Sequence, residues 1–147
     1  LEALVSQTIY DEIPKEELYK AKIKHERQIK KVNFAPMWEA LFKDLNQQKS
    51  KSFIATKFHK SLTYILLDWI KGAVHTLEIE GKLNGPGSQL KIALSGGCFQ
   101  NNTLLENLAL LLEKSGFIPI IQSELPANDG GISYGQALIA AAKHLKS

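Results

Sequence analysis

The 147-residue sequence predicts a helix-rich α/β fold built around a short parallel β–α–β unit. Two apolar segments, 90–94 and 117–121, have the length and composition of strands, and a helical pattern of leucines lies between them. Strands joined through a helix run parallel, and such crossovers are right-handed. Upstream, apolar residues recur at spacings of three and four from 55 to 77, which predicts a long helix.

The elements that precede the long helix are expected to be shorter. Residues 1–9 read as the end of a helix, and 18–33 alternate apolar and charged residues in a way that favours an exposed pair of strands. Pro36 is expected to begin an amphipathic helix, because proline suits the first helical turn. The apolar residues expected on one face of that helix are Met37 or Trp38, Leu41 and Leu45.

Turn-forming residues separate the later elements. Segment 84–88, Asn-Gly-Pro-Gly-Ser, is expected to be a loop, and Gly116 is expected to terminate the helix between the two strands. Pro119 has no N–H to donate to a neighbouring strand, so the strand 117–121 is expected at a sheet edge or at a bulge. A last helix is expected over 131–145.

The composition fits one soluble globular domain, with 44% hydrophobic and 22% charged residues, and we treat 1–147 as a single domain. No apolar run of about 18 residues occurs, so no membrane is expected as a partner. The single cysteine, Cys98, excludes an internal disulfide and a cysteine-cluster zinc site, and it fits a reducing cytoplasm. Because the chain starts with Leu inside an apparent helix, we expect it to be a fragment of a larger protein.

The net charge of +3 reflects an excess of lysine and arginine over acidic residues between 15 and 31. Such a run usually forms a solvated face. It lacks the interleaved aromatic residues typical of nucleic-acid binding, so we do not expect nucleic acid as a partner. Histidines are the other candidate ligands. The four, His25, His59, His75 and His144, do not pair at the spacing of metal ligands, and we expect His59 to serve in packing.

Two Gly-Gly pairs mark candidate ligand sites. Gly96 and Gly97 follow a strand in KIALSGGCFQN, and Gly130 and Gly131 precede the last helix in PANDGGISYGQ. Glycine permits left-handed backbone angles and close approach of a ligand, and the N–H groups at a helix start favour an anion such as phosphate. A plain strand-to-helix turn would use the same residues. Asp129 likewise either binds a metal ion that holds phosphate or caps a turn.

Taken together, the segments SGGCFQN, LLENLALLLEKSGF and LPANDGGISYGQALIAAA resemble the C-terminal end of the hydrogenase-maturation carbamoyltransferase family HypF. KFHKSLTYILLDW resembles that family's helix before the strand, and the resemblance is specific from about 52 to 145. It implies one lobe of an actin-like ATPase/sugar-kinase (ribonuclease H-like) fold, the C-terminal lobe of a carbamoyl-transfer module. That module is similar to the tRNA threonylcarbamoyl-transfer enzymes.

The resemblance also implies a function. Members would bind ATP or carbamoyl-adenylate together with a divalent metal ion, and would transfer the carbamoyl group to the C-terminal cysteine of the acceptor protein HypE. That product becomes the cyanide ligand of nickel–iron hydrogenases. Carried over to this sequence, the implied roles are nucleotide binding for Ser95, Gly96, Gly97, Asn101, Gly130 and Gly131, and metal binding for Asp129. Cys98 stands where the family usually has Val and is expected to be a small apolar filler.

The sequence departs from the family pattern in one respect. It lacks the family's His-x-x-x-His metal motif, so the remaining metal ligands are expected outside this chain, and its isolated activity is expected to be negligible. Two alternatives stay open. One is threonylcarbamoyl transfer to tRNA, against which Gln100 and the NDGG sequence argue. The other is a non-enzymatic regulatory domain of the same fold.

Overall fold

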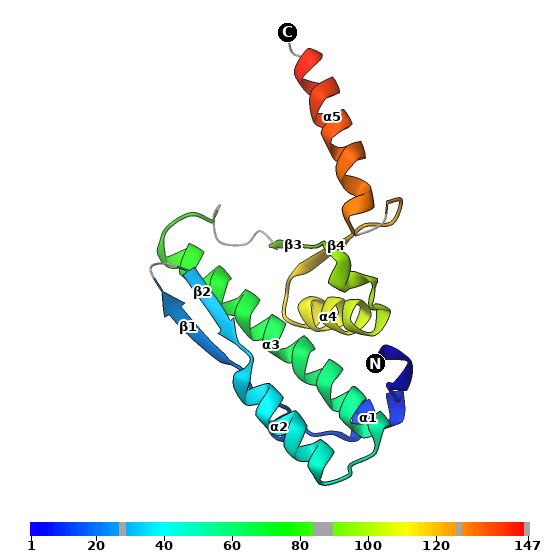
Figure 1. The fold of residues 1–147 in the computed structure, drawn as a ribbon. Coiled ribbons are helices and arrows are strands. Elements are labelled where there is room, and N and C mark those ends of the chain that lie inside the picture. Colours follow the sequence, from blue (N-terminus) through cyan, green and yellow to red (C-terminus); the bar gives the residue numbers. More distant parts are fainter. Residues whose placement is uncertain (27–28, 84–89, 126–127, 146–147) are drawn as a thin grey trace.

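A computed structural model describes residues 1–26, 29–83, 90–125 and 128–145. The long helix α3 (Lys51–Ile79) runs through its centre, with a helix and a hairpin on one side and a β–α–β unit on the other (Figure 1). The remaining elements in chain order are η1 (Glu2–Leu4), α1 (Gln7–Glu12), η2 (Lys15–Glu17), β1 (Lys22–Glu26), β2 (Ile29–Asn33), α2 (Ala35–Asn46), β3 (Lys91–Leu94), η3 (Gly97–Gln100), α4 (Asn102–Lys114), β4 (Ile118–Ile121), η4 (Asp129–Gly131) and α5 (Ile132–His144), where η denotes a 3₁₀ turn.

Helix α3 is covered on two sides, and the core is correspondingly divided. One cluster of buried residues joins α3 to α2 and the chain before β1: Tyr19, Met37, Leu41, Ile54 and Ile65. The other joins α3 to the β–α–β unit: Leu67, Leu94, Leu108, Ala109 and Leu112. Because both sides are covered, small polar residues of α3 are buried too, and their hydroxyls donate to carbonyls of the preceding turn, as Thr63 does to His59.

The N-terminal segment contains two short elements, so the expected single helix over 1–9 is wrong. Ser6 interrupts it, because its hydroxyl accepts a hydrogen bond from the N–H of Ile9 and so begins α1 as a new helix. The backbone N–H of Ser6 also donates to Oγ1 of Thr56 at 3.0 Å. Lys60, another α3 residue, donates to the carbonyls of Tyr10 and Ile13 and so satisfies the end of α1.

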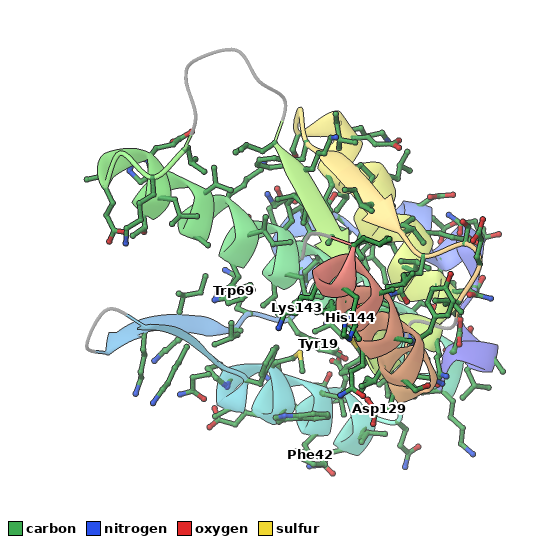
Figure 2. The ribbon with its side chains drawn as sticks, turned by 90° about the horizontal axis from the view of Figure 1, so that it is seen from above. Tyr19, Phe42, Trp69, Asp129, Lys143 and His144 are labelled. Carbon is green, nitrogen blue, oxygen red and sulfur yellow. The ribbon has the colours of Figure 1, made fainter. Side chains whose placement is uncertain are left out.

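Helix α2 packs on α3 through a narrower stripe than the sequence pattern suggests. Met37 and Leu41 are buried as expected, and of the two alternatives Met37, not the 45% exposed Trp38, lies on the buried face. Leu45 is 46% exposed, so its assignment to that face is wrong. Asp44 takes the next position of the stripe. It is held there because the Tyr19 hydroxyl donates a hydrogen bond to the Asp44 carboxylate at 2.7 Å. Figure 2 shows the ring of Phe42 on the outer face of α2.

The Asp44 carboxylate is the centre of a buried polar network. Lys57 Nζ lies 2.9 Å from Asp44 Oδ2, in addition to the bond from Tyr19. Burial tends to raise the pKa of Asp44, but the hydrogen bonds from Lys57 and Tyr19 outweigh it and hold that pKa below its ordinary value. Burial and the neighbouring carboxylate raise the pKa of the Tyr19 hydroxyl well above its usual range. The network therefore favours an ionised Asp44 beside a neutral tyrosine.

Both sheets confirm their predicted pairings. Strands β1 and β2 are antiparallel, with Lys22 opposite Asn33. Strands β3 and β4 are parallel, with Lys91 opposite Ile118 and Leu94 opposite Ile121. Within the described residues this second sheet has two strands, so β4 is an edge strand as its proline predicts.

Helix α4 ends as the sequence predicts. Gly116 adopts a φ of +85°, and its N–H donates to the Glu113 carbonyl at 2.9 Å. The next N–H, of Phe117, donates to the Leu112 carbonyl at 3.0 Å. This pair of bonds is the glycine-terminated Schellman motif, and it turns the chain directly into β4.

Helix α5 projects away from the rest of the chain (Figure 1), and none of its residues is buried. Its exposed apolar side chains are Ile132, Tyr134, Leu138 and Ile139. The expected loop at 84–88 lies outside the described residues. In the ranges that the structure describes, no helix is both long and apolar enough to cross a bilayer.

Candidate nucleotide-binding site

The first glycine pair forms an open turn at the end of β3. Leu94 is buried, Ser95 is exposed, and Gly96 then adopts a φ of +108°, a conformation that side chains disfavour. Gly97 follows as the first residue of η3. A Cβ atom added at Gly96 or Gly97 would meet no heavy atom within 4 Å. The backbone of this turn therefore faces open space that a ligand can enter.

The glycine pair opens a 3₁₀ turn, whereas α4 begins later, at Asn102, so the expected direct passage from glycine pair to helix is wrong. The start of α4 is also already hydrogen-bonded. The N–H of Leu104 donates to Asn101 Oδ1 at 2.9 Å, and the N–H of Thr103 donates to Glu2 Oε1 at 2.9 Å. Protein groups thus take N–H groups that a phosphate at this helix start would use.

Asn101 connects this region to α3. Its side-chain Nδ2 lies 2.8 Å from Nε2 of His59, and its Oδ1 caps α4. Nδ1 of His59 lies 2.8 Å from the Ala55 carbonyl. His59 is buried, as expected of a packing residue, but it also fixes the position of a predicted nucleotide-binding residue.

The second glycine pair forms η4, directly before α5. Asn128 is the capping residue there, since its Oδ1 accepts from the N–H of Gly130 at 3.0 Å and its carbonyl accepts from the N–H of Gly131 at 3.1 Å. Asp129 is exposed and has no such capping contact. In Figure 2 it lies at the end of α5 opposite to Lys143 and His144. The carboxylate is thus accessible to a cation.

The chain leaves β3 and β4 at the same edge of the sheet, because the carboxyl ends of parallel strands lie together, and this is where open α/β sheets bind ligands. The first glycine turn follows β3 directly, whereas η4 begins at Asp129, beyond the end of β4 at Ile121. A hollow of about 250 Å³ lies beside the chain as it leaves β4, lined by residues 121–125. A slightly larger hollow, of about 290 Å³, lies between η2, β1 and α3 and has no glycine-turn residue in its lining. The position of the Gly96–Gly97 turn at the end of β3, rather than the volume of a hollow, favours this turn as the site.

Asp129 alone does not make a metal site. Across the described ranges, no three or more His, Cys, Asp or Glu side chains gather in a way that could hold a metal ion. Divalent cations are held by several oxygen ligands, so Asp129 can contribute one ligand of a site that other residues complete. This finding agrees with the absence of a His-x-x-x-His motif from the sequence.

Cys98 is exposed on η3, so its interpretation as an apolar filler is wrong: the turn directs it away from the core, which Phe99 contacts instead. The lysines of the basic region whose side chains are described are exposed, as the expected solvated face requires: Lys15, Lys20, Lys22, Lys24 and Lys31.

Residues 1–136 match the family model for the second subdomain of the carbamoyltransferase, Kae1-like domain, of HypF proteins. The chain belongs to the HypF family. HypF of Synechocystis sp. is 38% identical over 111 residues, which are 74% of this chain and 13% of that protein. HypF2 of Cupriavidus necator is 31% identical over 109 residues, 74% of this chain and 12% of that protein. The chain thus spans about an eighth of the length of these HypF relatives.

Solved structures agree with this assignment. A crystal structure of full-length HypF in the phosphate- and nucleotide-bound form matches 95% of this chain, with a TM-score of 0.70 and 32% identity, and the match covers 16% of that chain. The crystal structure of T. kodakarensis HypF matches 95% of this chain with a TM-score of 0.60 and 16% identity, which shows the fold alone. The helix-rich α/β architecture with its small parallel sheet is therefore a HypF architecture.

Proposed function

We propose that this chain is the nucleotide-binding C-terminal lobe of a carbamoyltransferase. The observation that carries the proposal is the open glycine turn at the carboxyl end of β3, where Gly96 takes a left-handed φ and Gly97 faces empty space. Such turns admit the phosphate groups of nucleotides close to the backbone. The HypF relative with a TM-score of 0.70 is a nucleotide-bound protein, which supports a nucleotide as the ligand here.

The lobe assignment, within an actin-like fold, has separate support. Helix α5 and strand β4 expose several large apolar side chains, including Ile120, Ile121, Leu138 and Ile139. Exposed apolar patches of this kind usually mark a surface that another domain or protein covers. The HypF relatives are far longer than the matched region. A second lobe would cover such surfaces and complete a nucleotide cleft between the two. Nucleotide, metal ion and acceptor would then meet between the lobes.

The proposed reaction is transfer of a carbamoyl group from carbamoyl-adenylate to the terminal cysteine thiol of HypE. The cysteine sulfur attacks the carbamoyl carbon, and a new C–S bond forms. The bond between that carbon and the adenylate oxygen breaks, AMP leaves with the electron pair, and the thiol proton passes to solvent. The carbamoyl carbon keeps its oxidation state, so no redox partner is required.

This chain's residues would hold the nucleotide during that step. The Gly96–Gly97 turn would accept the adenylate phosphate against its backbone, with Ser95 and Asn101 beside it, while Gly130 and Gly131 would allow the second turn to approach from the end of β4. Asp129 would supply one oxygen ligand to a divalent ion. Bound there, the ion would neutralise charge on the leaving phosphate.

The test is a transfer assay with the full-length protein. Radiolabelled carbamoyl phosphate, ATP and HypE are mixed with it, and label on HypE is counted after gel separation. We expect label on wild-type HypE and none on HypE lacking its terminal cysteine. The 147-residue chain by itself is expected to transfer none. ATP binding without any transfer of label to HypE would contradict the proposal.

A further inference from the structure

His59 is a buried histidine with both ring nitrogens engaged. Only 1% of its surface is exposed, and it lies in the N-terminal half of α3. Nδ1 is 2.8 Å from the carbonyl oxygen of Ala55, and Nε2 is 2.8 Å from the side-chain nitrogen of Asn101. A buried polar ring requires such partners, and both are supplied by the protein.

These partners define the proton position on the ring. The Ala55 carbonyl can only accept, so Nδ1 carries the proton and donates it. The orientation of the Asn101 amide is set independently, because its oxygen accepts from the N–H of Leu104 at 2.9 Å. Its nitrogen therefore faces His59 and donates to Nε2. In this arrangement Nε2 of His59 acts as the hydrogen-bond acceptor for the Asn101 amide.

Asn101 is the residue at which the glycine turn joins α4. Most of the turn before it is exposed (Ser95, Gly97, Cys98 and Gln100), whereas Gly96 and Phe99 are partly buried. Within the turn, the N–H of Phe99 donates to the Gly96 carbonyl at 3.0 Å and the N–H of Asn101 donates to the Cys98 carbonyl at 3.3 Å. Its upstream end is fixed by Leu94 in the core. Its downstream end is fixed by the bond from Asn101 to His59, 42 residues away in sequence.

We propose that His59 is a positioning residue for the nucleotide turn. It acts through Asn101, holding the segment from Gly96 to Gln100 in the shape that accepts the ligand, so that the ordering of the turn is completed before binding. This inference rests on the proposed function, since it assigns His59 to the same site. His59 itself touches no ligand in this account.

Two substitutions separate this role from simple packing. In His59→Gln, a side-chain oxygen reaches the position of Nε2 and can still accept from Asn101. In His59→Asn, the shorter amide can still donate to the Ala55 carbonyl but does not reach Asn101. Both variants lose one of the two hydrogen bonds, and Asn, one methylene shorter than Gln, leaves the larger space in the core. A packing role therefore predicts a lower melting temperature and faster exchange along α3, whereas a positioning role predicts a change confined to residues 95–104.

The readouts are hydrogen exchange of residues 95–104 by mass spectrometry and ATP affinity by calorimetry, both in the full-length protein. We expect His59→Asn to speed exchange in this segment and weaken ATP binding about tenfold, the equivalent of one unpaired hydrogen-bond donor. His59→Gln is expected to remain near wild type in both. Equal defects in the two variants, or none in either, would overturn the inference.

Asn101→Ser provides a second route if a His59 variant fails to fold. Serine retains an N-cap for α4 but cannot reach His59. We expect it to reproduce the exchange defect, and where His59→Asn folds we expect that substitution to add no further exchange defect in its background. Additive defects would overturn the inference. If wild-type protein binds no ATP, the proposed function fails, whereas the exchange data alone still decide whether His59 positions the turn.

Discussion

The carboxylate of Glu2 accepts a hydrogen bond from the backbone N–H of Thr103 at 2.9 Å, across 101 residues of sequence. Thr103 lies in the first turn of α4, where N–H groups have no partner within the helix. Glu2 therefore caps α4 from outside, next to the cap that Asn101 provides from within. The Glu2 cap therefore fastens η1 to α4 beside the glycine turn.

Replacing Glu2 with Ala should destabilise the chain by about 0.5–2 kcal/mol, because it removes a cap and a charge that favours the positive end of the helix. Urea unfolding monitored by circular dichroism gives the free energy of unfolding. The control is Glu2→Gln, which keeps an accepting oxygen and should recover part of the loss. If the Ala and Gln variants were as stable as the wild type, Glu2 would not cap α4.

Gln48 is the best position for a stabilising substitution. It follows α2 with a φ of +55°, and its N–H and that of Lys49 donate to Leu45 and Asp44, the same motif that Gly116 completes after α4. Gln48→Gly should raise the free energy of unfolding by about 0.5–1 kcal/mol, since glycine adopts this conformation without strain.

The matched control is Gly116→Ala, which places a side chain at a φ of +85°. It should lower the free energy of unfolding by about 1 kcal/mol in the same urea experiment. Opposite signs for the two changes are the expected result. A destabilised Gln48→Gly variant would mean that the Gln48 side chain contributes more than its backbone strain costs.

Acid should weaken the packing of α2 on α3. The pKa of Asp44 is lowered in the folded state by its bonds from Lys57 and Tyr19. The ionised form therefore contributes its full stabilisation at pH values above the ordinary aspartate pKa of about 4. That stability is lost as pH falls through the lower folded pKa. Asp44→Asn should cost about 1–3 kcal/mol at pH 7. On acidification, the free energy of unfolding of the Asp44→Asn variant should fall less than that of the wild type. If both fell equally, the ionisation of Asp44 would not be linked to folding.

Asp129 is expected to matter for activity and little for folding. It is exposed, and Asn128 already provides the cap of η4. In the full-length protein, Asp129→Ala should leave the melting temperature nearly unchanged, while bound metal falls and transfer to HypE is lost by orders of magnitude. Metal content by mass spectrometry and the transfer assay measure this. A variant with a melting temperature several degrees lower, yet with normal metal and turnover, would assign Asp129 a purely structural role.

Local sequence patterns predicted the main elements of the fold. The leucine repeat of α4, the glycine after it and the apolar strands on either side define the β–α–β unit with only small changes of boundary. Patterns failed where tertiary contacts decide the outcome. Asp44 replaces Leu45 in the buried stripe of α2 because Tyr19 and Lys57, distant in sequence, supply its partners.

The sequence indicates the glycines of the candidate site, but it does not indicate the distant residues that hold them in place. Gly96 could be singled out because a glycine pair after a strand indicates an unusual backbone angle, and its φ is indeed +108°. Glu2 and His59 could not, since each acts on α4 or its cap from a distant segment, and a lone acidic residue or histidine carries no local pattern. The Phe-His pair at 58–59 was the one available signal, and it suggested packing alone.

Calorimetric titration of the full-length Gly97→Val variant with ATP tests nucleotide binding at the Gly96–Gly97 turn most directly. A Cβ at Gly97 would meet nothing in the protein within 4 Å, so a side chain there obstructs a ligand without straining the fold. We predict an unchanged melting temperature with ATP affinity reduced more than about tenfold, and an intermediate loss for Gly97→Ala. Equal ATP affinities for wild type and Gly97→Val would contradict nucleotide binding at this turn.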